Sequence, residues 1–256
     1  MHRIALLGAA LLGSATLALP TAAQADDAQP TVLFIVSAHE HGYWLPEVLT
    51  PYKILTDAGI DVVFATPGGR PGVPAGDDWM SNDERETLAS LTATLAAPNR
   101  LADIDPADFD ALYVPGGAGP MFDLFDHPHV NRITATLYED GKPVAADCHG
   151  PVAFAAVRLS NGELMVRNKR LTAKSNAEEG DWARANYPFL LEDKLMAVNA
   201  RFSAAAPYEP WVVQDGHLLT GQNPASAGPL AQTLVTMLTA NDQPSENSLP
   251  TNGVKQ

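Results

Sequence analysis

Residues 143–152 read P-V-A-A-D-C-H-G-P-V. A short apolar run ends there at Cys148, the only cysteine of the chain, and the small residues Ala146 and Gly150 flank it two positions away on each side. An apolar run, a turn of small residues and then a proline predict a strand, a tight turn and a helix over about residues 151–159. Small flanking residues suit a strained turn, because a larger side chain would clash there.

This pattern resembles the nucleophile elbow G-x-S-x-G, with Cys148 in place of the serine and Ala146 in place of the first glycine. The N-terminal amides of the following helix and the adjacent His149 favour a reactive thiolate. Asp147 acts against it, since a nearby carboxylate disfavours a second negative charge. The alternative is that Cys148 is a small buried apolar residue, the usual fate of a free cysteine.

The first 25 residues have the pattern of a secretory signal peptide. A basic start with Arg3 precedes an apolar segment over residues 4–20, and A-Q-A at residues 23–25 fits the small-x-small cleavage rule. The apolar segment is too short and too rich in glycine and alanine for a membrane span. We expect cleavage after Ala25 and export to a bacterial periplasm. One domain over residues 26–240 and a flexible polar tail over residues 241–256 would remain.

The amino-acid composition limits which molecules the protein can bind and how its fold can be stabilised. The formal net charge is −14 at pH 7, and it becomes about −15 when Arg3 is removed with the signal peptide. An acidic surface disfavours nucleic acids and anionic membranes as partners. One cysteine forms no internal disulfide, so the fold must depend on its hydrophobic core even in an oxidising compartment.

Alternating apolar strands and amphipathic helices predict a doubly wound, flavodoxin-like α/β/α sandwich with a mostly parallel central sheet. Strands are expected at residues 31–37, 60–66, 109–114, 143–147 and 170–174, with a hairpin over residues 211–221. Helices are expected at residues 45–58, 83–97, 130–140, 151–159, 189–199 and 229–239.

The carboxyl ends of the strands are the expected position of a site in such a fold. Glu47 in the first turn of its helix, Gly117 in a glycine-rich turn and Cys148 all follow predicted strands at that edge. The irregular segment over residues 70–106 is either a lid or wall of this site or a surface elaboration. Two H-x-H pairs, at residues 39–41 and 127–129, supply two ligands each, so no metal site is predicted.

Six stretches resemble the PfpI branch of the class I glutamine amidotransferase-like superfamily. Within that branch the resemblance is to glutathione-independent glyoxalase III proteins, also described as heat-shock-type chaperones. The stretches are W-L-P-E at 44–47, P-G-G-A-G at 115–119, A-D-C-H-G-P at 146–151, L-T at 171–172 with E-E at 178–179, P-F-L-L-E-D at 188–193 and T-G-Q-N-P-A-S at 220–226.

The resemblance implies roles for individual residues. Cys148 would be the nucleophile, His149 its triad histidine and Glu179 the acidic third member, with Glu178 as the alternative register. Glu47 would be a carboxylic acid hydrogen-bonded near the thiol. The backbone amides of Gly117 and His149 would form the oxyanion hole. Trp44 and Ala118 would line the substrate pocket, with Ala118 standing where the family often has a histidine.

The implied activity is conversion of methylglyoxal, or another α-oxoaldehyde, to D-lactate through a hemithioacetal on Cys148, without a cofactor. Alternatives are a stress chaperone that binds apolar segments, an oxidant sensor, and a cysteine-dependent amide hydrolase or peptidase. The resemblance also implies a homodimer.

Overall fold

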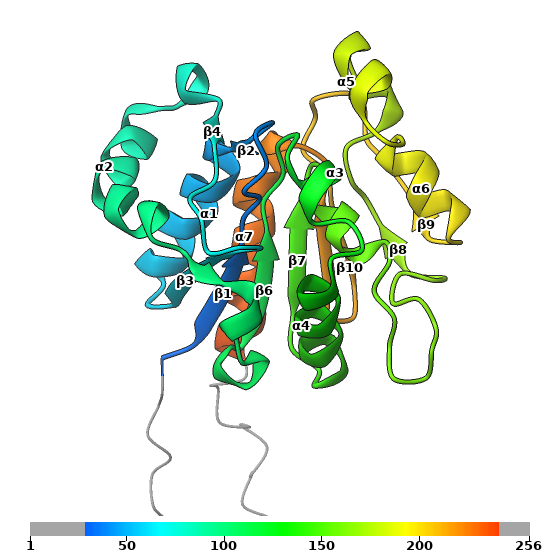
Figure 1. Cartoon of the computed structure of the whole chain (residues 1–256), viewed down its shortest axis with the longest axis horizontal. Coiled ribbons are helices and arrows are strands. Elements are labelled where there is room, and N and C mark those ends of the chain that lie inside the picture. Colours follow the sequence, from blue (N-terminus) through cyan, green and yellow to red (C-terminus); the bar gives the residue numbers. More distant parts are fainter. Residues whose placement is uncertain (1–28, 241–256) are drawn as a thin grey trace, which may run out of the picture.

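The structure is a computed structural model, and it describes residues 29–240 (Figure 1). The predicted signal peptide and the predicted polar tail lie outside the described residues. Seven strands form one sheet in the order β10-β11-β7-β6-β1-β3-β5. All neighbouring strands in this sheet are parallel except β10 and β11, which form the predicted hairpin. The predicted mostly parallel α/β fold is therefore confirmed.

The strands of the sheet are short, and the inner ones are largely apolar and buried. The seven strands are β1 (Thr31–Ile35), β3 (Asp61–Thr66), β5 (Asn99–Arg100), β6 (Ala111–Val114), β7 (Val144–Asp147), β10 (Val212–Asp215) and β11 (Leu218–Gly221). Two small parallel pairs lie outside the sheet: β2 (Tyr43–Trp44) with β4 (Pro74–Ala75), and β8 (Arg170–Leu171) with β9 (Arg201–Phe202). The α-helices are α1 (Leu45–Asp57), α2 (Asn82–Ala96), α3 (Pro120–Asp123), α4 (Pro128–Glu139), α5 (Asp181–Asn186), α6 (Leu191–Ala197) and α7 (Ala227–Ala240).

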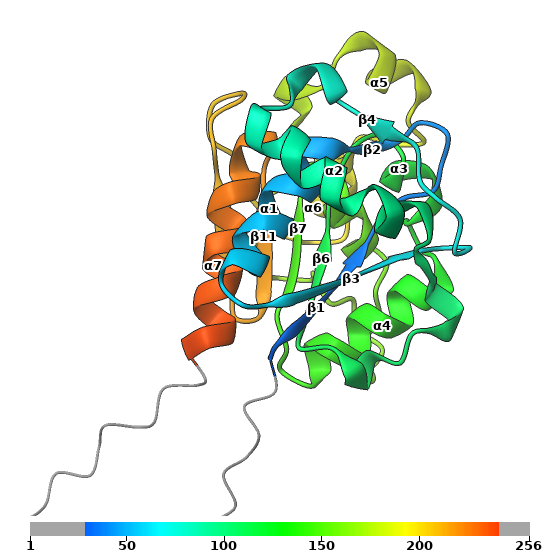
Figure 2. The ribbon, with the colours of Figure 1, turned by 90° about the vertical axis from the view of Figure 1, so that its left-hand side faces the viewer.

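Helices cover both faces of the sheet, as the two ribbon views show (Figures 1 and 2). Alternate residues of β1 point to opposite faces of the sheet. Val32 and Phe34 pack against α1 and α7 on one face, and Leu33 and Ile35 pack in the core that includes α4 on the other. Burial on both faces explains why this strand reads as a continuous apolar run in the sequence. Within residues 29–240, no helix has the length and apolar character needed to cross a bilayer.

Two predicted elements differ from the structure. The helix expected over residues 151–159 is a short 3-10 helix, η4 (Gly150–Phe154), because the chain then turns back and Arg158 pairs with Leu164 in an antiparallel bridge. The strand expected over residues 170–174 is only β8, and it lies outside the main sheet. Beyond β8 the backbone is held by other partners: the Lys174 N–H donates to the Cys148 carbonyl oxygen at 2.8 Å.

The turn after β7 has the strained geometry that the small residues predicted. Cys148 has a φ of 54°, in the left-handed region that side chains other than glycine rarely adopt. Gly150 passes so close to β6 that an added Cβ would lie 2.0 Å from the Val114 carbonyl oxygen. The absent side chain of Gly150 therefore permits the approach of the turn to β6.

A Gly150→Ala substitution tests this close approach. We expect a loss of stability of at least about 1–3 kcal/mol, because backbone atoms must shift to admit the methyl group. The measurement is the midpoint of urea unfolding at a constant m-value. Gly228→Ala is the matched control: its added Cβ would meet only side-chain carbons, the nearest at 3.6 Å. Because Gly228 lies inside α7, the control should gain roughly 0.5–1 kcal/mol. Equal unfolding midpoints for the two variants would contradict the interpretation.

Candidate active site

Three side chains form a hydrogen-bonded chain at the carboxyl edge of the sheet. The Cys148 sulfur lies 3.5 Å from Nδ1 of His149, and Nε2 of the same ring lies 2.8 Å from Oε1 of Glu179. All three residues are buried. A proton on Nε2 that is donated to Glu179 leaves the lone pair of Nδ1 facing the sulfur. His149 is then placed to accept the thiol proton.

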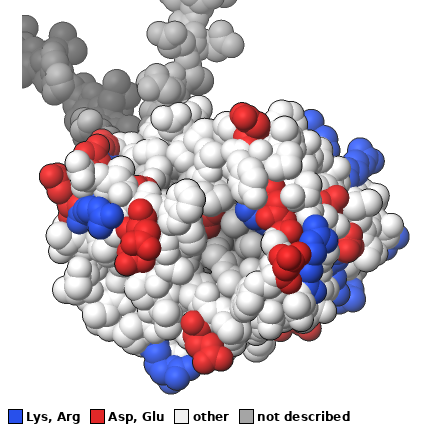
Figure 3. Space-filling view, turned by 90° about the horizontal axis from the view of Figure 1, so that it is seen from above, with Lys and Arg blue, Asp and Glu red and all other residues white. Residues whose placement is uncertain are grey.

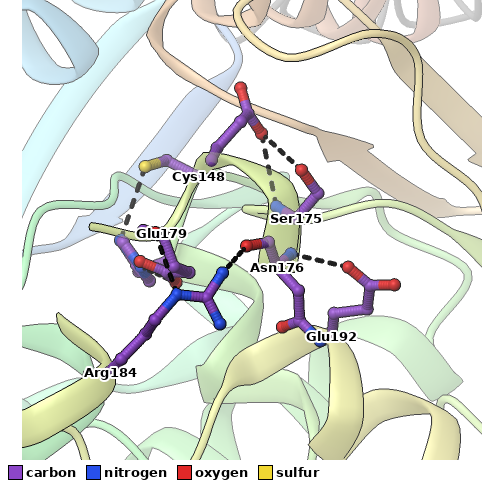
Figure 4. A network of polar contacts seen from close by, with 8 residues as sticks. Cys148, Ser175, Asn176, Glu179, Arg184 and Glu192 are labelled. Carbon is purple, nitrogen blue, oxygen red and sulfur yellow. Dashed lines mark hydrogen bonds and ion pairs between the residues drawn. The ribbon is translucent and has the colours of Figure 1, made fainter. Parts of the chain in front are cut away.

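The segment η5 (Asn176–Glu178) and its neighbours position Glu179. Arg184 of α5 donates from Nε to the Glu179 carbonyl oxygen at 3.2 Å, and its guanidinium also contacts the Asn176 carbonyl oxygen. The Asn176 N–H in turn donates to Glu192 at 2.6 Å. Figure 4 shows this sequence of contacts from Cys148 through Glu179 and Arg184 to Glu192.

Glu178, the alternative register, has different partners. Its carboxylate accepts hydrogen bonds from Asn223 at 2.9 Å, from Gln222 at 3.0 Å and from the Ser175 hydroxyl at 3.0 Å. The Tyr208 N–H donates to it at 2.8 Å. Glu178 therefore joins loops together, and Glu179 is the glutamate beside His149.

The side chains of Glu47 and Cys148 both lie against Gly116. A Cβ added to Gly116 would lie 2.7 Å from Cβ of Cys148 and 2.8 Å from Oε2 of Glu47. Glu47 is fully buried, in the first turn of α1. Burial raises the pKa of its carboxyl to about 8, against smaller lowering effects of the Cys148 thiol, Lys174 and the Gly116 amide. At neutral pH Glu47 therefore holds a proton.

Asp147 adds a second buried acid beneath this pair. It is fully buried, and burial together with the Glu47 charge raises its pKa well above the ordinary value. Tyr113, a fully buried tyrosine of β6, lowers the Asp147 pKa by less than burial raises it. The buried position behind Cys148 thus disfavours the ionised form of Asp147.

The resting thiol is protonated, in contrast to the thiolate that the elbow pattern favours. Burial and the charges of Glu47 and Asp147 raise the pKa of Cys148, and Lys174 and the Gly117 amide lower it by less. The helix expected to stabilise a thiolate is only the five-residue η4. A short 3-10 helix contributes less dipole than a full α-helix.

A cavity of about 340 Å³ opens over Cys148. Its lining includes the predicted residues Trp44, Gly117, Ala118 and His149. Sequence reasoning missed the four largest of the other lining residues, which are His41, Lys174, Trp182 and Tyr187, and Ala75 and Pro224 complete the lining. Tyr187 contacts the His149 ring edge-on, with centroids 5.1 Å apart, and Trp182 contacts both His41 and Tyr187. No local motif marks these residues, because separate loops bring them together.

The segment over residues 70–106 forms part of the cavity wall. Its strand β4 pairs with β2, and Ala75 of β4 lines the cavity beside Trp44 of β2. Seen from above, this face is hollowed near its centre, and both acidic and basic side chains lie at the edge of the hollow (Figure 3). A larger cavity of about 720 Å³, which includes His39, Arg70 and Asp123, shares no lining residue with the Cys148 cavity.

Gly117 has a φ of +99°, and its backbone amide lies near enough to Cys148 to lower the thiol pKa. The other predicted oxyanion-hole amide is that of His149. A Cβ added to Gly116 would lie 2.8 Å from the His149 nitrogen, so this amide borders the same space as Glu47 and Cys148. The two amides thus lie close to the sulfur. Among residues 29–240, no group of three or more histidine, cysteine, aspartate or glutamate side chains has the arrangement of a metal site.

The pH dependence of Cys148 alkylation tests the effect of the buried acids. In the unaltered protein the apparent thiol pKa should exceed the value of about 8.5 for a free cysteine. Glu47→Gln and Asp147→Asn each remove an acid whose ionised form opposes the thiolate, so each should move the rate profile to lower pH. Iodoacetamide incorporation measured by mass spectrometry reports Cys148 alone, since the chain has no other cysteine. The exposed control Glu86→Gln should leave the profile unchanged. If the pH profile of alkylation were the same in Glu47→Gln as in the unaltered protein, Glu47 would not influence the Cys148 pKa.

The chain is similar in sequence to several known proteins. The DJ-1/PfpI family profile matches residues 31–237. Glyoxalase 3 of Candida albicans is 26% identical over 225 residues, which cover 81% of this chain and 94% of that protein. The human glutamine amidotransferase-like class 1 domain-containing protein 1 is 29% identical over 210 residues, covering 81% of this chain and 93% of that protein.

A solved structure shows the same fold. The crystal structure of glyoxalase III from Candida albicans superposes with a TM-score of 0.74 at 23% identity, covering 81% of this chain and 96% of that one. The family match extends over nearly all of the described residues, including both cores and every residue around Cys148 named above. The chain belongs to the DJ-1/PfpI family.

Proposed function

We propose that this protein is a cofactor-free enzyme of the glyoxalase III type, which converts methylglyoxal to D-lactate on Cys148. The observation that carries the proposal is the convergence of a buried, protonated glutamate with a buried thiol that has its own histidine. Such a reaction moves protons between two adjacent carbons, so it needs two proton-transferring groups beside one nucleophile. The similarity to Glyoxalase 3 supports the same assignment.

The first step forms the carbon–sulfur bond. His149 Nδ1, 3.5 Å from the sulfur, takes the thiol proton as the sulfur adds to the aldehyde carbon of the substrate. The amides of Gly117 and His149 face the oxygen that gains negative charge. His149 then returns the proton to that oxygen, which gives a neutral hemithioacetal.

Proton transfer follows on the two neighbouring carbons. His149 removes the hydrogen of the former aldehyde carbon as a proton, and Glu47 gives its proton to the ketone oxygen, which produces an enediol. The next carbon then takes the proton from His149, and the hydroxyl on the sulfur-bearing carbon returns one to Glu47. A 2-hydroxy thioester results. Water hydrolyses it to the 2-hydroxy acid and the free thiol, and both proton carriers are restored.

Variants of the two central residues test the proposal. Cys148→Ala and Glu47→Gln should each lower kcat/KM for methylglyoxal by about 10²-fold or more, because general acid–base and nucleophilic groups contribute that much. A chirally resolved lactate assay measures the product. Activity of the unaltered protein should fall as pH rises through about 8, where Glu47 loses its proton.

A control variant makes the result specific. Glu86→Gln, on the exposed surface of α2, should retain the activity of the unaltered protein. Wild-type rates in Cys148→Ala would contradict the proposal. Hydrolysis of amide substrates with no conversion of 2-oxoaldehydes would instead assign the site to a hydrolase.

We also propose that the chain is exported, on the strength of the signal-peptide pattern in residues 1–25. Expression in a Gram-negative host should place the protein in the periplasmic fraction. Its intact mass should correspond to a chain that begins at Asp26. Retention of residues 1–25 in the cytoplasmic fraction would contradict export.

A further inference from the structure

Lys174 lies at the junction of two cavities. One is the cavity of about 340 Å³ over Cys148, and the other is an adjoining cavity of about 430 Å³ with Trp79 and Tyr208 in its lining. Trp44, Lys174 and Pro224 line both. The cavity over Cys148 is by itself larger than a three-carbon aldehyde requires, and its volume falls in the range that holds larger ligands.

Lys174 is also the only charged lysine or arginine in the lining of either cavity. None of the ion pairs within residues 29–240 includes it. Of the nearby acids, Glu179 is engaged with His149, and Glu178 with Asn223, Gln222 and Ser175. The third, Glu47, is fully buried and holds a proton at neutral pH. A partly buried ammonium group without a carboxylate partner favours an anionic ligand.

The structure holds this ammonium group in place. The Lys174 backbone N–H donates to the carbonyl oxygen of Cys148 at 2.8 Å, which ties the lysine to the nucleophile. At the other end of the side chain, Nζ lies 5.5 Å from the centre of the Tyr208 ring, in cation–π range. A substrate bonded to Cys148 would therefore have a fixed positive charge within reach of its far end.

On the basis of the proposed function, we propose that the site prefers 2-oxoaldehydes that carry a carboxylate, and that Lys174 recognises this group. The reactive end would occupy the cavity over Cys148, and the carboxylate would lie at the junction with the second cavity. The chemistry at the sulfur is unchanged: 4,5-dioxopentanoate and water give 2-hydroxyglutarate, with one proton released. Trp44 and Trp182 supply apolar walls for the intervening carbons.

A matched pair of substrates tests the preference. The first is 4,5-dioxopentanoate, and the second is its neutral isostere 4,5-dioxopentanamide. The unaltered protein should show a kcat/KM ratio of about tenfold or more in favour of the carboxylate, as expected for one charge-assisted contact. Lys174→Met should bring the ratio close to one, and Lys174→Arg should keep most of it. Lys53→Met, an exposed lysine of α1, should leave the ratio unchanged.

The kcat/KM ratio of the two substrates separates recognition of the carboxylate by Lys174 from an effect of Lys174 on the Cys148 thiol. If Lys174 only lowers the Cys148 pKa, Lys174→Met slows both substrates equally and the ratio stays, which would overturn the proposal. A ratio of one in the unaltered protein would also overturn it, while activity on both substrates would leave the proposed function standing.

A binding measurement keeps the test independent of turnover. Calorimetry with the unreactive pair 4-oxopentanoate and 4-oxopentanamide should show tighter binding of the carboxylate, lost in Lys174→Met and kept in Lys174→Arg. Equal affinities for the two compounds would overturn the recognition of anions by Lys174. Absence of turnover on both aldehydes together with selective carboxylate binding would refute the glyoxalase assignment and retain the anion site.

Discussion

The left-handed backbone of Cys148 is the constraint on which the site depends. At a φ of 54° the chain reverses at the end of β7, and the sulfur is held at the carboxyl edge of the sheet. The reversal requires room on every side: Gly150 lies against the Val114 carbonyl oxygen, and Gly116 lies beneath Cys148 and Glu47. Small residues at these positions are therefore a steric condition for placing the thiol between its amides and its histidine.

Electrostatics gives this site an unusual resting state. Glu47, Asp147 and Cys148 are all buried close together, and burial opposes charge on each of them. A protonated thiol is less readily oxidised than a thiolate, which suits a chain with one cysteine. In the mechanism that we propose, reactivity then depends on proton transfer from the thiol to His149 when a substrate is present. Lys174 is the cation that favours the charged forms of both Glu47 and Cys148.

Much of the fold was predictable because its signals are local. Two-sided burial makes β1 continuously apolar, and one-sided burial makes α1 amphipathic. The helix after the elbow was predicted wrongly, since a proline and apolar residues do not show that Arg158 will pair with Leu164. The choice of Glu179 over Glu178 also depends on distant partners. Asn223 and Gln222 engage Glu178, and their position in the sequence gives no sign of it.

The sequence by itself determined the alternating architecture, the tight turn at Cys148 and the set of residues whose resemblance to a family marked a site. These depend on hydrophobic periodicity and on steric limits within a few residues. Only the tertiary structure decided the protonation state of the thiol, the wall of His41, Trp182 and Tyr187, and the place of Lys174 between two cavities. The burial of a side chain and the charges around it depend on segments that are distant in sequence, so both are set only once the chain has folded.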